Sequence, residues 1–139
     1  MNAGRALIFL SVALFFVNVA PVYSHHSEAS QFDRDDPVSV EGVVSKLEWT
    51  NPHVWYYVVV TDENGEATTW GFSGLPPGVL RRRGITRDTL KVGDVVRVTG
   101  NRARDGSNNA SGYNITFPDG RRVFTGSADT SQPQPQPQP

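Results

Sequence analysis

The chain has no cysteine, and its only methionine is Met1 at the start of the sequence. Without thiols there can be no disulfide framework, so the fold has to be stabilised by burial of aromatic and β-branched side chains. The absence of cysteine also removes the thiol as a catalytic nucleophile, and no serine lies in a recognisable nucleophile elbow. These absences predict a protein that is not an enzyme.

An apolar run long enough to form a membrane helix is also missing. The one apolar run, residues 6–20, has about 15 residues, whereas a bilayer needs roughly 20. Arg5 precedes this run and small residues follow it, which is the pattern of a secretory signal peptide. We expect cleavage of residues 1–24 to leave a mature chain that begins at His25, with cleavage after Ala20 as the alternative. The mature protein is then expected to work outside the cytoplasm without a membrane anchor.

Neither sign of charge is in large excess. The signal contains one of the 13 basic residues and none of the 14 acidic ones, so the mature chain has 12 basic and 14 acidic residues and a formal charge of −2. A nucleic-acid partner is therefore not expected, since such partners require a basic surface. The 115 residues that remain are enough for one small domain.

The middle of the chain alternates between strand-like runs and turn residues. Five runs of β-branched and aromatic residues, the last followed by a hairpin partner at 121–125, lie at 38–47, 54–60, 67–72, 95–100 and 113–117. The only helix-like stretch, 79–90, lies between the third and fourth runs and is expected to be short and interrupted at Gly84. This order predicts an all-β fold with one short helix, namely an OB-fold-like five-stranded Greek-key barrel. An open β-sandwich of the same strands is the alternative.

Two polar segments flank the predicted barrel. Residues 25–37 form a polar, acidic arm, which is typical of a solvated leader. Residues 127–139 end in an alternation of Gln and Pro that is typical of a disordered, polyproline-like tail. The barrel itself is expected to occupy residues 38–126.

A second feature of the strands is their aromatic content. The run from Val54 to Val60 is apolar on both faces, so one face is expected to be core and the other to be covered or available for binding. Strands two and three of OB-folds present a surface on which ligands stack. The candidate ligand or partner face consists of Trp49, Trp55, Tyr57 and Trp70. The alternative is that these side chains belong to the core.

Several short motifs of the chain occur together in a known family. They are His25-His26-Ser27, Phe32-Asp33, Pro37-Val38 with Gly42-Val43, Trp49-Thr50-Asn51-Pro52-His53, Arg83-Gly84 and Lys91-Val92-Gly93-Asp94-Val95. Together they resemble the domain-of-unknown-function family 6152 (DUF6152), small exported bacterial proteins whose function is not established. The resemblance implies a periplasmic location and no particular reaction. The chain departs from the family pattern after Trp70, where an acidic residue is expected and Gly71 is found.

All three histidines lie in these motifs, two at the predicted mature N-terminus and His53 between the first two predicted strands. Once cleavage exposes His25, its α-amine and ring Nδ1 can chelate one metal ion, and a nitrogen of His53 or His26 can complete a square-planar set suited to Cu(II). The lack of sulfur disfavours Cu(I), and Zn(II) is the alternative ion. The alternative interpretation is that His25 and His26 are solvated and that His53 stabilises a turn.

These observations support two functional hypotheses. The first is a periplasmic, non-enzymatic protein that binds Cu(II), or alternatively Zn(II), through His25, His53 and His26. The second is a metal-free module that binds a periplasmic protein or a small ligand on the aromatic face and on the 103–112 loop.

Overall fold

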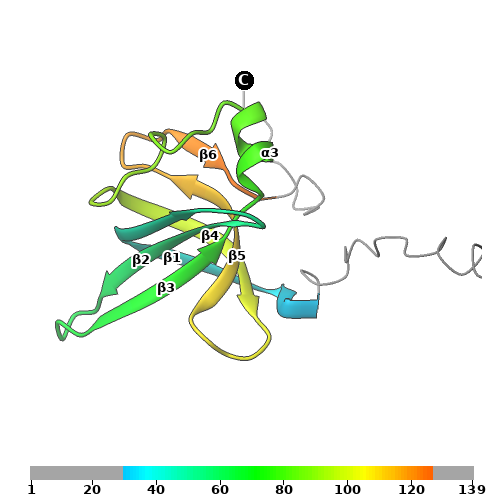
Figure 1. Ribbon diagram of the computed structural model, residues 1–139. Helices are drawn as coiled ribbons and strands as arrows, with labels where there is room; N and C mark the ends of the chain where they lie inside the picture. The colour runs from blue at the N-terminus through cyan, green and yellow to red at the C-terminus, as the bar shows by residue number, and fades with distance from the viewer. Residues whose placement is uncertain (1–29, 127–139) are drawn as a thin grey trace, which may run out of the picture.

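The computed structural model describes residues 30–126, which form a small β-rich domain with one short helix (Figure 1). The strands are β1 (Phe32–Trp49), β2 (Val54–Thr61), β3 (Ala67–Ser73), β4 (Val95–Ala103), β5 (Asn109–Thr116) and β6 (Arg122–Phe124), and the helix is α3 (Pro77–Arg82). No helix among these residues is both long and apolar enough to cross a bilayer.

Five of the strands form a closed ring. The order along the sheet is β3-β2-β1-β4-β5-β6, and a parallel pairing of β3 with β5 joins Gly71–Ser73 to Asn109–Ser111. All other neighbouring strands are antiparallel, and β6 extends the sheet beyond the ring as the hairpin partner of β5. The predicted all-β, OB-fold-like five-stranded barrel with one helix between its third and fourth strands is therefore confirmed.

Strand β1 is long because it serves two neighbours. Its first part pairs with β4 and its last part with β2, and Val43 is paired with Val95 on one side and Val59 on the other. At this crossing the strands come so close that a Cβ atom on Gly42 would clash with the carbonyl oxygen of Val59. A glycine is needed here because it has no side chain to collide with the neighbouring backbone.

Strand β1 also starts earlier than the sequence pattern predicts, at Phe32 instead of Val38. Phe32 is buried, and it is paired with Ala103 at the end of β4. The acidic residues that follow it face basic partners on or next to β4, as the ion pairs of Asp33 with Arg104 and of Asp36 with Arg102 show. This stretch reads as polar, but it is stabilised as strand by cross-strand pairing.

The helix is short and ends at Arg82, just ahead of the interruption predicted at Gly84, although it begins at Pro77, two residues before the predicted 79–90 stretch. Gly84 follows with a φ of 77°, a left-handed conformation that terminates helices and that glycine adopts at little cost. Leu80 and Leu90 are both buried, so the segment still covers apolar surface on either side of the break. Figure 1 places α3 at the opposite end of the barrel from the β2–β3 and β4–β5 turns.

The core lies inside the ring and follows the alternation of the strands. Val54, Tyr56 and Val58 of β2 are buried, whereas Trp55, Tyr57 and Val59 are partly exposed on the other face. The buried cluster is completed from the remaining strands and the helix connection by Val40, Val44, Phe72, Leu90, Val96, Val98, Ala110, Ile115, Phe117 and Val123. The interior is thus filled with side chains.

Candidate ligand-binding face

Two of the four candidate aromatic side chains lie together on the outside of β2. The ring centroids of Trp55 and Tyr57 are 6.4 Å apart, and their planes differ by 24°. Both point outward because Val54, Tyr56 and Val58 fill the interior side of the same strand. The two nearly parallel rings therefore form one aromatic pair on the outer face, the aromatic platform.

The platform adjoins Gly71 of β3, which is buried. Gly71 is paired with Tyr57, and a Cβ atom at this position would lie 3.5 Å from the Trp55 ring and 3.4 Å from the Tyr57 ring. The same Cβ atom would lie 2.5 Å from Oδ1 of Asn109, which the parallel pairing brings alongside from β5. Glycine is thus the residue that fits between the aromatic pair and this amide.

Charged side chains of β1 border the platform on its other side. Lys46 forms an ion pair with Glu48, and its ammonium group lies 5.2 Å from the centre of the Tyr57 ring. The hydroxyl of Tyr57 donates a hydrogen bond of 3.1 Å to Oε2 of Glu48. The hydrogen bonds from Lys46 and Tyr57 lower the pKa of the Glu48 carboxyl, which is therefore ionised at neutral pH.

A groove of about 450 Å³ opens at the edge of the platform where the chain enters β1. Its walls come from the start of β1, the β4–β5 loop and β2, and it is lined by Ser30, Gln31, Phe32, Trp55, Ala103, Arg104, Asp105 and Asn109. Arg104 donates a hydrogen bond of 3.2 Å to Asp33. The groove therefore has both apolar and polar lining, with apolar surface predominating, and its arginine is already paired.

The other two candidate aromatics lie elsewhere. Trp70 stacks on Phe72 with ring centroids 6.2 Å apart and packs against the core, and the guanidinium of Arg102 lies 5.0 Å from its ring centre. Trp49 lies at the end of β1, where its carbonyl oxygen accepts a hydrogen bond of 3.3 Å from Arg87. The structure thus brings together Trp55 and Tyr57, and it places Trp70 and Trp49 in different surroundings.

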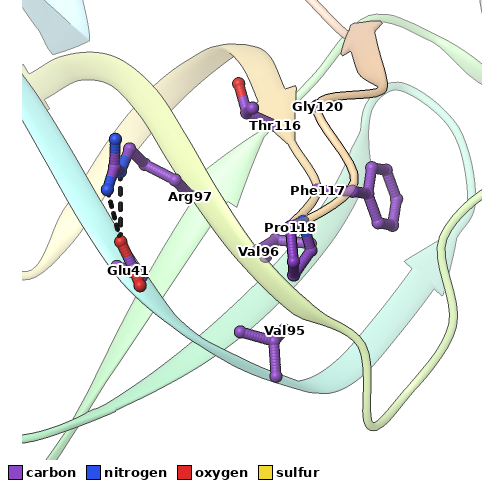
Figure 2. A pocket seen from close by; sticks show the side chains of 8 residues that line it. All are labelled: Glu41, Val95, Val96, Arg97, Thr116, Phe117, Pro118 and Gly120. Carbon is purple, nitrogen blue, oxygen red and sulfur yellow. Dashed lines mark hydrogen bonds and ion pairs between the residues drawn. The ribbon is translucent and has the colours of Figure 1, made fainter.

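The second groove, of about 310 Å³, lies over β1, β4 and the β5–β6 turn (Figure 2). Glu41 and Arg97 form an ion pair of 2.7 Å at its edge. Val95 and Phe117 supply apolar lining, and the guanidinium of Arg121 lies 3.7 Å from the centre of the Phe117 ring. The charged and aromatic groups of this groove are engaged with one another.

His53 lies in the short connection between β1 and β2. Its Nδ1 atom is 2.9 Å from the carbonyl oxygen of Gly74, and the ring is partly buried. A carbonyl oxygen can only accept, so Nδ1 carries the proton and Nε2 keeps a free lone pair. His25 and His26 lie outside the described residues, and residues 30–126 contain no group of three or more His, Cys, Asp or Glu side chains that could hold a metal ion.

Sequence reasoning identified the aromatic pair but missed its neighbours. Glu48 and Lys46 are the cross-strand partners of Trp55 and Tyr57, so their place on this face follows once the β1–β2 register is known. Asn109 gave no signal, because it belonged to an expected loop and reaches the platform only through ring closure.

Comparison with known proteins bears on the chain as a whole. A family model described as a family of unknown function, DUF6152, matches residues 14–113. The chain belongs to this family. The matched region of this DUF6152 protein contains β1 to β4 and part of β5, and it includes both His53 and the aromatic platform. No curated protein matches the chain, and no solved structure matches it.

Proposed function

We propose that the protein is a periplasmic, non-enzymatic binding protein that holds one Cu(II) ion between His25 at its mature N-terminus and His53. The observation that supports this role is the hydrogen bond from Nδ1 of His53 to Gly74. Histidines that ligate metals generally donate their other ring nitrogen to a carbonyl or carboxylate, which fixes the tautomer and the orientation of the ring. His53 is held in this way with Nε2 free.

The position of the start of β1 supports the pairing of His25 with His53 as metal ligands. Ser30 and Trp55 line the same groove, and His53 precedes Trp55 by two residues, roughly 7 Å along an extended strand. The five residues before Ser30 can span up to about 17 Å when extended. The amine and ring of His25 are therefore within reach of Nε2 of His53, and His26 is available as a further nitrogen ligand.

The ligand set selects the ion by its chemistry. An α-amine and two imidazoles offer nitrogen only, which suits Cu(II) in square-planar geometry and also Zn(II). The chain has no cysteine, and its one methionine belongs to the predicted signal, so the mature protein lacks the soft sulfur ligands that Cu(I) prefers.

Calorimetric titration with Cu(II) of three forms of the mature protein tests this proposal. The chain that starts at His25 should bind one ion, and one extra residue ahead of His25 should weaken binding on the order of tenfold or more, because it converts the chelating amine into an amide. His53→Ala should weaken binding to a similar extent. Thr50→Ala, in the same connection, is the matched control and should leave the affinity unchanged.

The titration has two further arms. Zn(II) in place of Cu(II) identifies the preferred ion, and His26→Ala shows whether that ring is the additional ligand. Weak and equal Cu(II) binding by all forms, with the fold intact, would reject the metal site.

The second proposed function is binding of a metal-free ligand on the outside of β2. It is favoured by one observation, namely that Trp55 and Tyr57 lie side by side on the outer face and are both partly exposed. Aromatic rings at the surface of a domain that has a filled core provide stacking area for a partner.

A further inference from the structure

We infer that the outer face of β2, β3 and β5 is a binding site for a neutral oligosaccharide, with sugar rings stacked on Trp55 and Tyr57. This inference rests on the second proposed function and is independent of the copper site. It follows from the shape of the platform, the polar groups around it and the pairing of its charges.

The platform offers aromatic surface of the kind on which sugar rings stack. The planes of Trp55 and Tyr57 are nearly parallel, with an interplanar angle of 24° and centroids 6.4 Å apart, and both rings are partly exposed on the outer face of β2. The faces of aromatic rings are electronegative and attract the weakly positive C–H groups on the flat side of a pyranose.

Hydrogen-bonding groups surround the platform where the hydroxyl groups of a sugar would lie. The Glu48 carboxylate borders it on β1, and it is ionised because the hydrogen bonds from Lys46 and Tyr57 lower its pKa. On the opposite side, Nδ2 of Asn109 donates a hydrogen bond of 3.0 Å to Ser107, which directs the carbonyl oxygen of this amide toward Gly71. Two acceptors thus flank the rings from opposite strands.

The pairing of charges indicates that the ligand is neutral. Lys46 is paired with Glu48 and Arg104 with Asp33, so each cation beside the platform is balanced by a neighbouring carboxylate. Asp105, at the groove, has a lowered pKa because it accepts hydrogen bonds from Ser107, and it adds a further negative charge. A nucleotide or a sulfated sugar would be repelled, whereas an uncharged polyhydroxyl ligand would not.

The adjoining groove sets the size of the ligand. Its volume of about 450 Å³ lies within the range of roughly 300–1,000 Å³ that is typical of small-molecule sites. The groove begins at Trp55 and runs toward Arg104 and Asp105. A chain of several sugar units can therefore stack on the platform and extend into the groove.

The experiment titrates the mature protein with chitotetraose, cellotetraose and maltotetraose while backbone amide shifts are followed by NMR. At least one of these neutral tetrasaccharides should bind and shift the amides of Gly71 and Asn109. Trp55→Ala should weaken that binding roughly tenfold, as expected for loss of one stacking ring. Trp49→Ala is the matched control and should bind as the wild type does.

Three outcomes would overturn the inference, and each is distinct from failure of the copper proposal. The first is that none of the three sugars shifts Gly71 or Asn109. The second is that Trp49→Ala weakens binding as much as Trp55→Ala. The third is that AMP, used as a planar anionic probe, binds the same face more tightly than any sugar. His53→Ala and addition of EDTA should leave sugar binding unchanged, which separates this site from the metal site.

Discussion

Tyr56 shows how one buried side chain connects distant parts of the chain. Its hydroxyl is 3.0 Å from Oγ1 of Thr125, and Thr125 in turn donates to the carbonyl oxygen of Gly112. A Cβ atom on Gly112 would clash with the Tyr56 hydroxyl. Burial raises the pKa of Tyr56 well above its ordinary value, since the phenolate would have to exist without water.

This raised pKa predicts a loss of stability at high pH. Above pH 10 the unfolded chain releases the Tyr56 proton while the folded chain keeps it, so the contribution of this residue falls as pH rises, by about 1.4 kcal/mol per pH unit. Tyr56→Phe removes the hydroxyl and costs about 1 kcal/mol at pH 8. Urea unfolding should find the wild type and the variant about equally stable near pH 11.

The test is the difference between two unfolding curves. If Tyr56→Phe remains less stable than the wild type by the same amount from pH 8 to pH 11, the hydroxyl ionises equally in both states and is not sequestered. A circular dichroism spectrum at each pH serves as the control for intact structure.

At the residue scale, the sequence predicted which side chains point in and which point out. The alternation of Val54 to Val60 separated Tyr56 from Trp55 and Tyr57 correctly, because a strand has a side-chain period of two. The sequence did not predict that Trp70 packs against the core and does not join Trp55 and Tyr57 on the outer face. On β3 the assignment to a face depends on the pairing with β2, which the isolated run does not define.

At the level of elements, the first part of β1 pairs with β4, which the sequence pattern did not predict. Phe32 is only 6% exposed, and it is the one large apolar residue in the first part of this strand. The acidic residues behind it are matched by Arg102 and Arg104, a correspondence that is visible only when β1 and β4 are aligned. Local composition therefore predicted a solvated arm where long-range pairing produces a strand.

Phe32 is accordingly expected to contribute to stability. Phe32→Ala should lower the free energy of unfolding by about 3 kcal/mol, because it removes a buried ring and leaves a cavity. Phe124→Ala is the matched control, since Phe124 is 58% exposed on β6 and its loss should cost less than about 0.5 kcal/mol. Urea denaturation of the two variants measures both values. Equal small losses would mean that the start of β1 is not docked.

At the scale of the whole molecule, the order of strands and the position of the helix could be predicted from runs, turns and breakers along the chain. The closure of the ring could not, because the contact of β3 with β5 joins segments almost 40 residues apart and has no local signal. The candidate face could likewise be predicted only in part, because some of its residues come together only through ring closure. Its rings follow from the composition of β2, whereas Asn109 and the groove exist only because the ring is closed.

The processing of the chain is predicted at this scale too. Export should remove residues 1–24 and leave His25 with a free amine, as the basic, apolar and small residues of this segment indicate. Intact-mass measurement of the protein recovered from the periplasm decides between this form and one that begins at Pro21. A mature chain that begins at Pro21 would lack the chelate of amine and imidazole, so the copper proposal depends on this mass.

The closed ring also determines the order in which the structure can be completed. A chain that emerges from its N-terminus can form the β1–β2–β3 meander early, since these strands are neighbours in sequence. The barrel interior stays open until β5 has emerged and paired with β3, and the Tyr56 hydroxyl acquires its partner only when Thr125, 69 residues later, has arrived. Nearly the whole domain, from β1 to Thr125, must therefore be available before any part of it can become fully stable.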